Sequence, residues 1–320
     1  MTTPSTSNET SITPGGVVLI SGASSGIGMA SALALAQAGW RTIATVRDPN
    51  GSRKLLIAAE AQGVALDVQH LDVTDPESVE KVRSYVDDTY GRLDAVVNNA
   101  GSAGLGTIEL MTMQNFRACM EVNFFGAVTI TKSMFPLLRA SRGRILSISS
   151  IAGALGQPFN EAYCSSKFAL EGFMESLHPV ARTVGVTVCL VEPAAVASAF
   201  VANADVDIPG MLDDAGPYRA AMEKSLARTQ RQFEPSKAET SEAVAAVVVD
   251  LLESAEPPLR TQTTPNARAI VALKIADLDG SRVTELTHSW LADPVREPAR
   301  VAGLRPQGAS PLPEPAPIWP

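Results

Sequence analysis

Between residues 17 and 191 the chain alternates short apolar runs with longer segments of helical periodicity. Apolar runs of this length predict buried strands, and they lie at 17–20, 41–46, 68–71, 94–97, 144–148 and 186–191. We expect helices over 29–38, 54–62, 75–90 and 112–140, another helix around Tyr163 and Lys167, and a turn at 47–51. Nearly all-apolar strands that are joined by helices indicate a parallel sheet covered on both faces.

The pattern changes after residue 197. Residues 198–236 contain two Pro/Gly pairs and short apolar turns, and so long a segment inside a compact domain is usually functional. We therefore expect a lid over a substrate site, after which a helix at 241–253 and a strand near 259–262 rejoin the sheet. The prediction is one α/β domain over 14–300, with a disordered tail at 1–13 and a Pro-rich tail at 301–320.

Composition narrows the possible classes of function. A hydrophobic fraction of 45% supports a sizeable core, and a net charge of −8 argues against nucleic-acid binding. No apolar run is long enough to span a membrane, and the N-terminal residues lack the pattern of a signal peptide. The three cysteines and three histidines are scattered, which argues against a metal site or a disulfide framework and favours a reducing cytoplasm.

A glycine cluster follows the first predicted strand. Gly22, Gly26 and Gly28 are spaced GxxxGxG between a strand and a helix, and Ser24 and Ser25 lie between the first two. Glycine allows a tight turn and a close approach to a pyrophosphate, which then rests on the helix N-terminus. We interpret the cluster as a dinucleotide site; the alternative is an ordinary flexible loop.

The end of the second strand discriminates between cofactors. An acidic side chain there suits the ribose hydroxyls of NAD, whereas an arginine suits the 2′-phosphate of NADP. The strand ends in Val46 and is followed by Arg47, which favours NADP(H) over NAD(H). Asp48 weighs against this choice, and the alternative for Arg47 is a plain surface charge.

Two further polar groups follow predicted strands. Asp72 and Val73 end the third strand, where a carboxylate can accept from an adenine amine, and Asn98-Asn99-Ala100-Gly101 ends the fourth. Asp and Asn are common after strands, so each group alone is weak evidence. All of these features fall at the carboxyl ends of strands, where open α/β sheets bind ligands.

Tyr163 and Lys167 are four residues apart, so they share one face of the predicted helix. A nearby ammonium lowers the pKa of a phenol toward the working pH, which makes the pair a candidate general acid/base. The alternative is a solvated helix face.

Taken in order, these motifs resemble the short-chain dehydrogenase/reductase family over about residues 15–290. The matching residues are Ser21–Gly28 with Ile27, Asn98–Gly101, Asn123 within Glu121–Gly126, and Ser150, which lies thirteen residues before Tyr163. Ser149 is a second choice for the serine. The run from Pro158 to Gly172 is similar to the subgroup of estradiol 17β-dehydrogenase type 1 and retinol dehydrogenases, although bacterial ketoreductases carry similar runs.

The resemblance implies a Rossmann-type sheet of about seven strands in the order 3-2-1-4-5-6-7, and a role for each matched residue. Tyr163 would exchange a proton with the substrate oxygen, and Ser150 would hold that oxygen. Lys167 would lower the phenol pKa and bind the nicotinamide ribose. Asn123 would interrupt its helix and position a water that relays protons to Lys167. A homodimer or homotetramer is also expected.

One stretch departs from the family pattern. After the sixth strand the family has Pro-Gly and then a Thr that contacts the nicotinamide, whereas this chain has Pro193-Ala194-Ala195-Val196-Ala197-Ser198. Ser198 keeps a hydroxyl at the Thr position, so cofactor contacts from Pro193, Val196 and Ser198 are still expected. Ala194 in place of glycine leaves the backbone shape of this loop open.

The function that we predict is NADP(H)-dependent interconversion of a ketone or aldehyde and an alcohol. Apolar lid residues favour a hydrophobic substrate, such as a steroid-like or another bulky carbonyl compound: Phe200, Val201, Met211, Leu212, Tyr218, Met222 and Leu226. Two alternatives are a dinucleotide-sensing regulator without turnover and an epimerase or dehydratase that uses bound cofactor. The presence of Asn123, Ser150, Tyr163 and Lys167 together favours the simple redox reaction.

Overall fold

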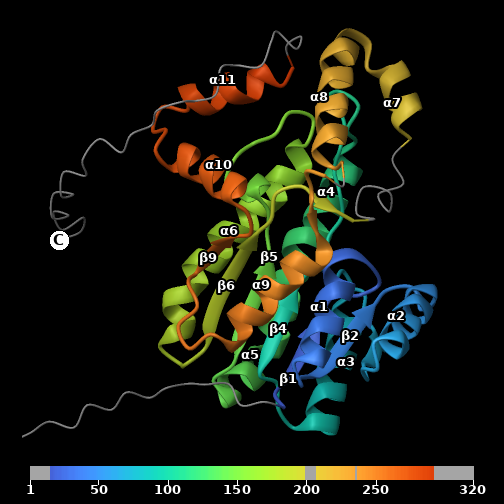
Figure 1. Cartoon of the computed structure of the whole chain (residues 1–320), viewed down its shortest axis with the longest axis vertical. Coiled ribbons are helices and arrows are strands. Elements are labelled where there is room, and N and C mark those ends of the chain that lie inside the picture. The colour runs from blue at the N-terminus through green and yellow to red at the C-terminus, as the bar shows by residue number, and fades with distance from the viewer. Residues whose placement is uncertain (1–14, 199–206, 235, 292–320) are drawn as a thin grey trace, which may run out of the picture.

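The computed structural model describes residues 15–198, 207–234 and 236–291; the tails predicted at 1–13 and 301–320 lie outside this range. Seven parallel strands form one sheet in the order β3-β2-β1-β4-β5-β6-β9 (Figure 1). They are β1 (Val17–Ile20), β2 (Arg41–Val46), β3 (Asp67–His70), β4 (Ala95–Asn98), β5 (Arg144–Ile148), β6 (Thr187–Glu192) and β9 (Arg260–Gln262). The predicted α/β fold and strand order are confirmed. Two short strands, β7 (Val196–Ala197) and β8 (Glu239–Thr240), pair separately.

The helices agree with the predicted alternation, and their bounds follow. They are α1 (Gly26–Gln37), α2 (Pro49–Ala61), α3 (Pro76–Tyr90), α4 (Met113–Met120), α5 (Gly126–Ser141), α6 (Glu161–Arg182), α7 (Ile208–Asp214), α8 (Arg219–Gln232), α9 (Ser241–Glu253), α10 (Pro265–Ile275) and α11 (Ser281–Ser289). Short turns of 3₁₀ helix occur at η2 (Ile151–Gly153) and η4 (Gly216–Tyr218). In the described ranges no helix has the length and apolar character needed to cross a bilayer.

Two helical segments differ from the prediction. The turn predicted at 47–51 is wrong beyond residue 48, because the Asp48 carboxylate caps α2 and Pro49 opens the helix. The helix predicted over 112–140 is divided between α4 and α5 by a π-helical turn, η1 (Glu121–Phe125). Such π-helical turns occur frequently at functional sites.

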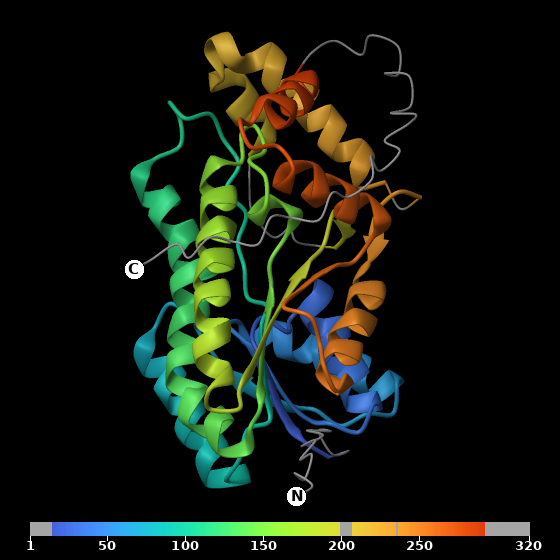
Figure 2. The ribbon, with the colours of Figure 1, turned by 90° about the vertical axis from the view of Figure 1, so that its left-hand side faces the viewer.

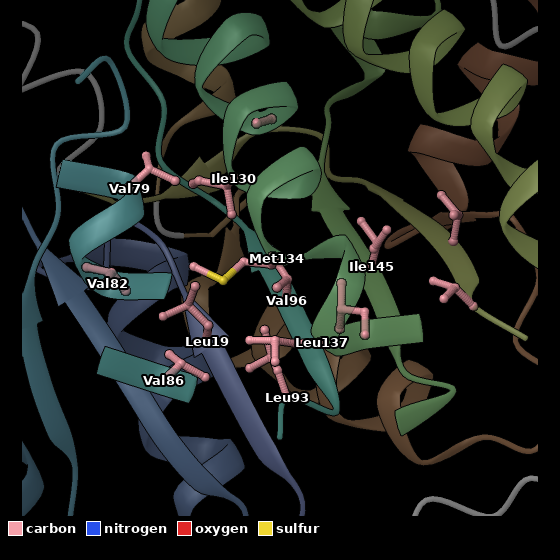
Figure 3. Packing of buried hydrophobic residues seen from close by; sticks show 14 of the residues in the cluster. Leu19, Val79, Val82, Val86, Leu93, Val96, Ile130, Met134, Leu137 and Ile145 are labelled. Carbon is pink, nitrogen blue, oxygen red and sulfur yellow. The ribbon is translucent and has the colours of Figure 1, made fainter. Parts of the chain in front are cut away.

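The core consists of two apolar layers, one on each face of the sheet. Figure 2 shows the helices that cover these two faces. On one face, α3 and α5 pack valines and long apolar side chains against β1, β4 and β5 (Figure 3). The labelled contacts include Val79, Val82 and Val86 from α3 and Ile130, Met134 and Leu137 from α5. On the other face, α1, α2 and α9 cover the sheet. This double burial explains why the strands are almost entirely apolar.

The elements that follow β6 lie mainly beyond the carboxyl ends of the strands. Helices α7, α8, α10 and α11 occupy the upper part of Figure 1, away from the two core layers. A small apolar cluster joins α7 and α8 to the loops before α4 and α6, with Phe159 and Met222 at its centre.

Candidate active site

A cavity of about 2120 Å³ runs along the carboxyl ends of the strands, where open α/β sheets bind their ligands. Typical ligand pockets measure roughly 300–1,000 Å³, so the space is ample for a dinucleotide and a second small molecule. The predicted residues on its wall are Gly22, Ser24, Ser25, Gly26, Ile27, Arg47, Asp72, Val73, Asn99, Ala100, Gly101, Ser150, Tyr163, Lys167, Pro193, Val196 and Ser198. Gly28 and Asn123 do not line the cavity; they support residues that do.

The turn between β1 and α1 needs glycine for two separate reasons. Gly22 has a φ of 71°, in the left-handed region that other residues rarely adopt. At Gly28 the limit is space, because a Cβ would lie 2.3 Å from the Gly22 carbonyl oxygen and 2.4 Å from Nδ2 of Asn99. That Nδ2 donates to the carbonyl oxygens of Ser21, at 2.9 Å, and of Gly22, at 3.0 Å. Asn99, which follows β4, therefore stabilises the shape of the glycine turn that follows β1.

The N-terminus of α1 contributes Gly26 and Ile27 to the cavity wall. Its N-cap residue, Ser25, makes no side-chain capping hydrogen bond, and the first turn contains no acidic residue. Backbone N–H groups at such a helix end favour an anion. The glycine turn and this helix end together fit the pyrophosphate of a dinucleotide.

Arg47 and Asp48 follow β2, at the position expected to discriminate between cofactors. Arg47 is exposed and lines the cavity. Asp48 accepts a hydrogen bond from the backbone N–H of Asn50 at 2.9 Å, as the N-cap of α2. The carboxylate that weighed against NADP is thus engaged in capping a helix.

Asp72, which follows β3, is also held locally. Its Oδ1 accepts from the backbone N–H of Thr74 at 2.9 Å and from the Thr74 hydroxyl at 2.7 Å. Burial acts to raise the pKa of this carboxyl, but the hydrogen bonds from Thr74 outweigh it, so the pKa is lowered. Asp72 therefore presents an ionised acceptor on the cavity wall at neutral pH.

Tyr163, Lys167 and Ser150 meet on one part of the cavity wall. A side-chain hydrogen bond joins Tyr163 to Ser150. The Lys167 Nζ lies 5.8 Å from the centroid of the Tyr163 ring and donates to the carbonyl oxygen of Ile148 at 2.8 Å. The structure thus brings together Ser150, which follows β5, and two residues of α6.

The electrostatics of this group differ from the expectation in one respect. Burial raises the pKa of Tyr163 above its ordinary value, although the hydrogen bond with Ser150 acts in the opposite direction. Burial also lowers the pKa of Lys167, to about 8. The net shift of Tyr163 is upward, so the lowering of the phenol pKa by Lys167 stays a prediction. The physical reason is that burial disfavours the charged form of both groups.

Asn123 lies in the π-helical turn η1 and is 1% exposed. Its Oδ1 accepts from the backbone N–H of Ser102 at 2.7 Å. Its Nδ2 donates to the Ser102 carbonyl oxygen and to the Ser166 hydroxyl, both at 2.9 Å. Asn123 thereby ties the loop after β4 to α6, the helix that carries Tyr163 and Lys167. Its role in a water relay stays a prediction.

Comparison with known proteins identifies the family. A sequence profile described as short chain dehydrogenase matches residues 16–208. The chain belongs to the short-chain dehydrogenase family. This dehydrogenase is 35% identical over 284 residues to retinol dehydrogenase 8 of Bos taurus, with 86% of this chain and 89% of the relative covered. It is 36% identical over 281 residues to estradiol 17-beta-dehydrogenase 1 of Rattus norvegicus, with 85% and 80% covered. The resemblance to that subgroup is confirmed.

A solved structure shares the fold of the dehydrogenase. A short chain dehydrogenase/reductase from Burkholderia phymatum, in complex with NAD, superposes with a TM-score of 0.72 at 24% sequence identity. The match covers 83% of this chain and 94% of that chain. The family is one of oxidoreductases that bind a nicotinamide dinucleotide, which agrees with the glycine turn described above.

The loop after β6 in the dehydrogenase is braced by Glu239, which itself lines the cavity. Glu239 Oε1 accepts from the backbone N–H of Ala194 at 3.0 Å and from the Thr263 hydroxyl at 2.6 Å. Among the described residues the only non-glycine positions with positive φ are Arg142 and Phe159. Ala194 therefore takes the place of the expected glycine without backbone strain.

Helix α8 forms part of the cavity wall of the dehydrogenase. Most of the cavity-lining residues of α8 and its C-terminal end recur at helical spacing: Met222, Ser225, Leu226, Thr229, Gln230 and Phe233. Gln232 lines the cavity as well. Of the predicted apolar lid residues, Met222 and Leu226 line the cavity, whereas Met211, Leu212 and Tyr218 pack in the apolar cluster. Phe200 and Val201 lie outside the described residues. Sequence reasoning missed the polar members, although helical spacing from Met222 is a signal that finds them.

The loop before α6 adds three residues to the wall that were not predicted as site residues: Gln157, Phe159 and Asn160. Phe159 has a φ of 62°, which is rare for a bulky residue, and it is 8% exposed. Its carbonyl oxygen accepts from the backbone N–H of Gly106 at 3.0 Å. Residues in such conformations cluster at ligand sites, so Phe159 joins the candidate substrate contacts.

Proposed function

We propose that this dehydrogenase interconverts a ketone or aldehyde and the corresponding alcohol on a fairly apolar small molecule, with NADP(H) as cofactor. The observation that carries the proposal is the hydrogen-bonded pair Tyr163 and Ser150, with Lys167 beside it, on the wall of a cavity that continues to the glycine turn. A proton donor for a carbonyl oxygen and a dinucleotide cradle in one cavity suit this reaction.

Each side chain has a distinct part in the proposed reaction. A bound nicotinamide cofactor supplies or accepts the hydride. Tyr163 gives its proton to the carbonyl oxygen during reduction and takes it back during oxidation. The Ser150 hydroxyl donates to the same oxygen and stabilises the charge that develops there. Lys167 contributes its ammonium charge beside the phenol. The raised pKa of Tyr163 keeps the phenol protonated at neutral pH, which suits the direction of reduction.

The choice of NADP(H) is supported by the loop after β2. Arg47 lines the cavity, no acidic residue ends the strand, and Asp48 is engaged as a helix cap. A guanidinium pairs well with a phosphate group and has no acceptor to offer ribose hydroxyls.

An apolar substrate is supported by the residues of the wall formed by α8 and the loop before α6. Phe159, Met222 and Leu226 line this part. Glu234 and Lys237, which also line the cavity, form an ion pair at 2.9 Å and so offset each other. Ser225 and Thr229 add uncharged hydroxyls, which suit a distal neutral polar group on the substrate.

The direct test is NADPH consumption against a panel of ketones and aldehydes. Replacing Tyr163 by Phe removes the proton donor and should reduce kcat about 10²- to 10⁴-fold. Tyr85→Phe is the matched control, because its hydroxyl bonds to Asp67 outside the cavity. Undiminished turnover in Tyr163→Phe contradicts the mechanism, and an absence of turnover across the whole panel contradicts the substrate class.

A further inference from the structure

Trp290 directly follows α11 and contacts parts of the molecule that are distant in sequence. Its side chain packs against a buried apolar cluster formed by residues of η2, the loop after it and α10. One member of that cluster, Ile151, follows Ser150 and lines the cavity. Leu291, directly after Trp290, packs in the apolar cluster around Met222 of α8. The end of α11 therefore bridges the region beside Ser150 and the part of the cavity wall that α8 forms.

The guanidinium of Arg228, on α8, lies over the ring of Trp290. Its Cζ is 3.6 Å from the ring centroid, which is the contact distance of two carbon atoms, and a guanidinium at this place is attracted by the ring face. Its Nη1 donates to Gln232 Oε1 at 2.9 Å, and Gln232 lines the cavity. Arg228 is half-buried, yet no carboxylate of the described residues pairs with it. The ring of Trp290 and the amide of Gln232 are therefore its main partners in this part of the chain.

The place of α8 in the fold makes this contact important. The elements that pack most closely on α8 in the described ranges are α7 and η4, which directly precede it in the chain. All three lie beyond the carboxyl ends of the strands, away from the two core layers (Figure 1). Helix α8 therefore depends on side-chain contacts with other elements to keep its position beside the cavity. Arg228 is well placed for this, because Ser225 and Gln232, which line the cavity, are its neighbours on the helix surface.

We propose that Trp290 is a positioning residue for the reaction: its ring binds the Arg228 guanidinium and so holds α8 at the distance from Ser150 that a bulky substrate requires. The inference rests on the assignment of α8 to the substrate side in the proposed function. Neither Trp290 nor Arg228 is among the described residues that line the cavity, so both act on the substrate through α8. Without their contact α8 moves outward. A bulky ketone then loses contacts with Met222 and Leu226, whereas a three-carbon ketone beside Ser150 does not.

The first test observes the contact itself. The full-length, cofactor-free protein is prepared with fluorotryptophan in place of its three tryptophans, and the fluorine NMR signal of Trp290 is assigned by its absence in Trp290→Phe. Arg228→Gln should shift this signal, because the cation over the ring is removed. Arg231→Gln is the matched control: it removes an equal charge from an exposed position three residues later on α8, and it should leave the signal in place.

The second test separates KM from kcat. Trp290→Leu and Arg228→Gln should each raise KM for a bulky ketone about 3- to 30-fold, the range that a cation–π contact supplies. The double variant should be no worse than either single variant, because both remove the same contact. Trp290→Phe keeps an aromatic face and should restore most of the loss. In all of these variants kcat with a three-carbon ketone and the affinity for NADPH should stay unchanged.

Several results would overturn the proposal. They are an unchanged Trp290 signal or an unchanged KM in Arg228→Gln, effects on KM that add in the double variant, and an equal rise of KM in Arg231→Gln. A fall of kcat with the three-carbon ketone would also overturn it, since that result indicates general damage to the fold. If Trp290→Leu does not fold, Arg228→Gln carries the same expectation alone. The fluorine signal needs no turnover, so failure of the proposed reaction is seen separately.

Discussion

The two sides of the cavity are built from different parts of the chain. On the side proposed for the cofactor, the backbone forms the wall, with the left-handed Gly22, the close approach at Gly28 and the two hydrogen bonds from Asn99. On the side proposed for the substrate, side chains of α8 and the loop before α6 form the wall. A wall formed by backbone tolerates almost no added atoms, whereas the shape of a wall formed by side chains changes with each single substitution. The cofactor side should therefore be fixed and the substrate side adaptable.

The largest effect is expected at Gly28. In Gly28→Ala the new methyl group would overlap the Gly22 carbonyl oxygen and Asn99 Nδ2, which hold each other in place. We expect NADPH affinity to fall more than about 100-fold, as the turn must open to accept the methyl group, and fluorescence titration measures this. Gly172→Ala is the control, since nothing lies within 4 Å of its Cβ position on α6; it should raise stability by up to about 1 kcal/mol. Equal NADPH affinities in Gly28→Ala and Gly172→Ala would contradict the distinction between a fixed backbone wall and an adaptable side-chain wall.

Arg47→Asp should have the next largest effect. Loss of a charge-assisted hydrogen bond to a phosphate, worth about 1.5–3 kcal/mol, weakens NADPH binding by about 10- to 100-fold. The new carboxylate should improve NADH binding, and the ratio of kcat/KM for the two cofactors measures the exchange. Arg53→Asp, also exposed but off the cavity wall, should leave the ratio unchanged. A preserved NADPH preference in Arg47→Asp would refute the role of Arg47.

Glu239 tests whether the loop after β6 belongs to the fixed side. Glu239→Ala strips the acceptor from the Ala194 N–H and the Thr263 hydroxyl, at a cost of about 1–3 kcal/mol. Thermal unfolding should show this loss, and NADPH affinity should fall roughly 10-fold. Glu239→Gln keeps one oxygen acceptor and should lose less of both. If NADPH affinity is unaffected in Glu239→Ala, the loop shape does not depend on this brace.

The smallest effect is expected on the substrate wall. Leu226→Ala removes about three carbon atoms from the side-chain wall, so KM for a bulky ketone should rise by up to about 10-fold. Kinetics with a three-carbon ketone and the affinity for NADPH should stay the same. Leu278→Ala, at a fully exposed position, is the control. A change in NADPH affinity in Leu226→Ala would mean that the two walls are coupled.

This division also explains what could be predicted from the sequence. Strands buried on both faces leave a continuous apolar run, so β1, β2, β5 and β6 were found within a residue or two. The glycine turn and Asn99 could be predicted, because the backbone geometry there requires particular residue types at particular spacings, and the sequence shows both. Helix α2 began too late in the prediction because Asp48-Pro49 was read as a turn, although the same Asp-Pro signal correctly placed the start of α3.

The remaining parts depend on which elements meet in space. The pKa of Tyr163 depends on its partial burial at the cavity wall, and a Tyr–Lys spacing of four residues contains no information on burial. Likewise, Arg228 and Trp290 are distant in sequence and meet only because the chain returns to α8 at the end of α11. The part of the cavity wall that α8 forms could be predicted in part, because its residues follow helical spacing. Which face of α8 points into the cavity could not be predicted.

The pairing of β7 with β8 has a consequence for the evolution of specificity. Val196 and Ala197 lie opposite Glu239 and Thr240, so the segment between β7 and β8 begins and ends at adjacent points of one ladder. The free energy of closing a loop between fixed ends changes only slowly with its length. We therefore expect that a longer or shorter segment can be grafted between these two strands while the glycine turn keeps its shape.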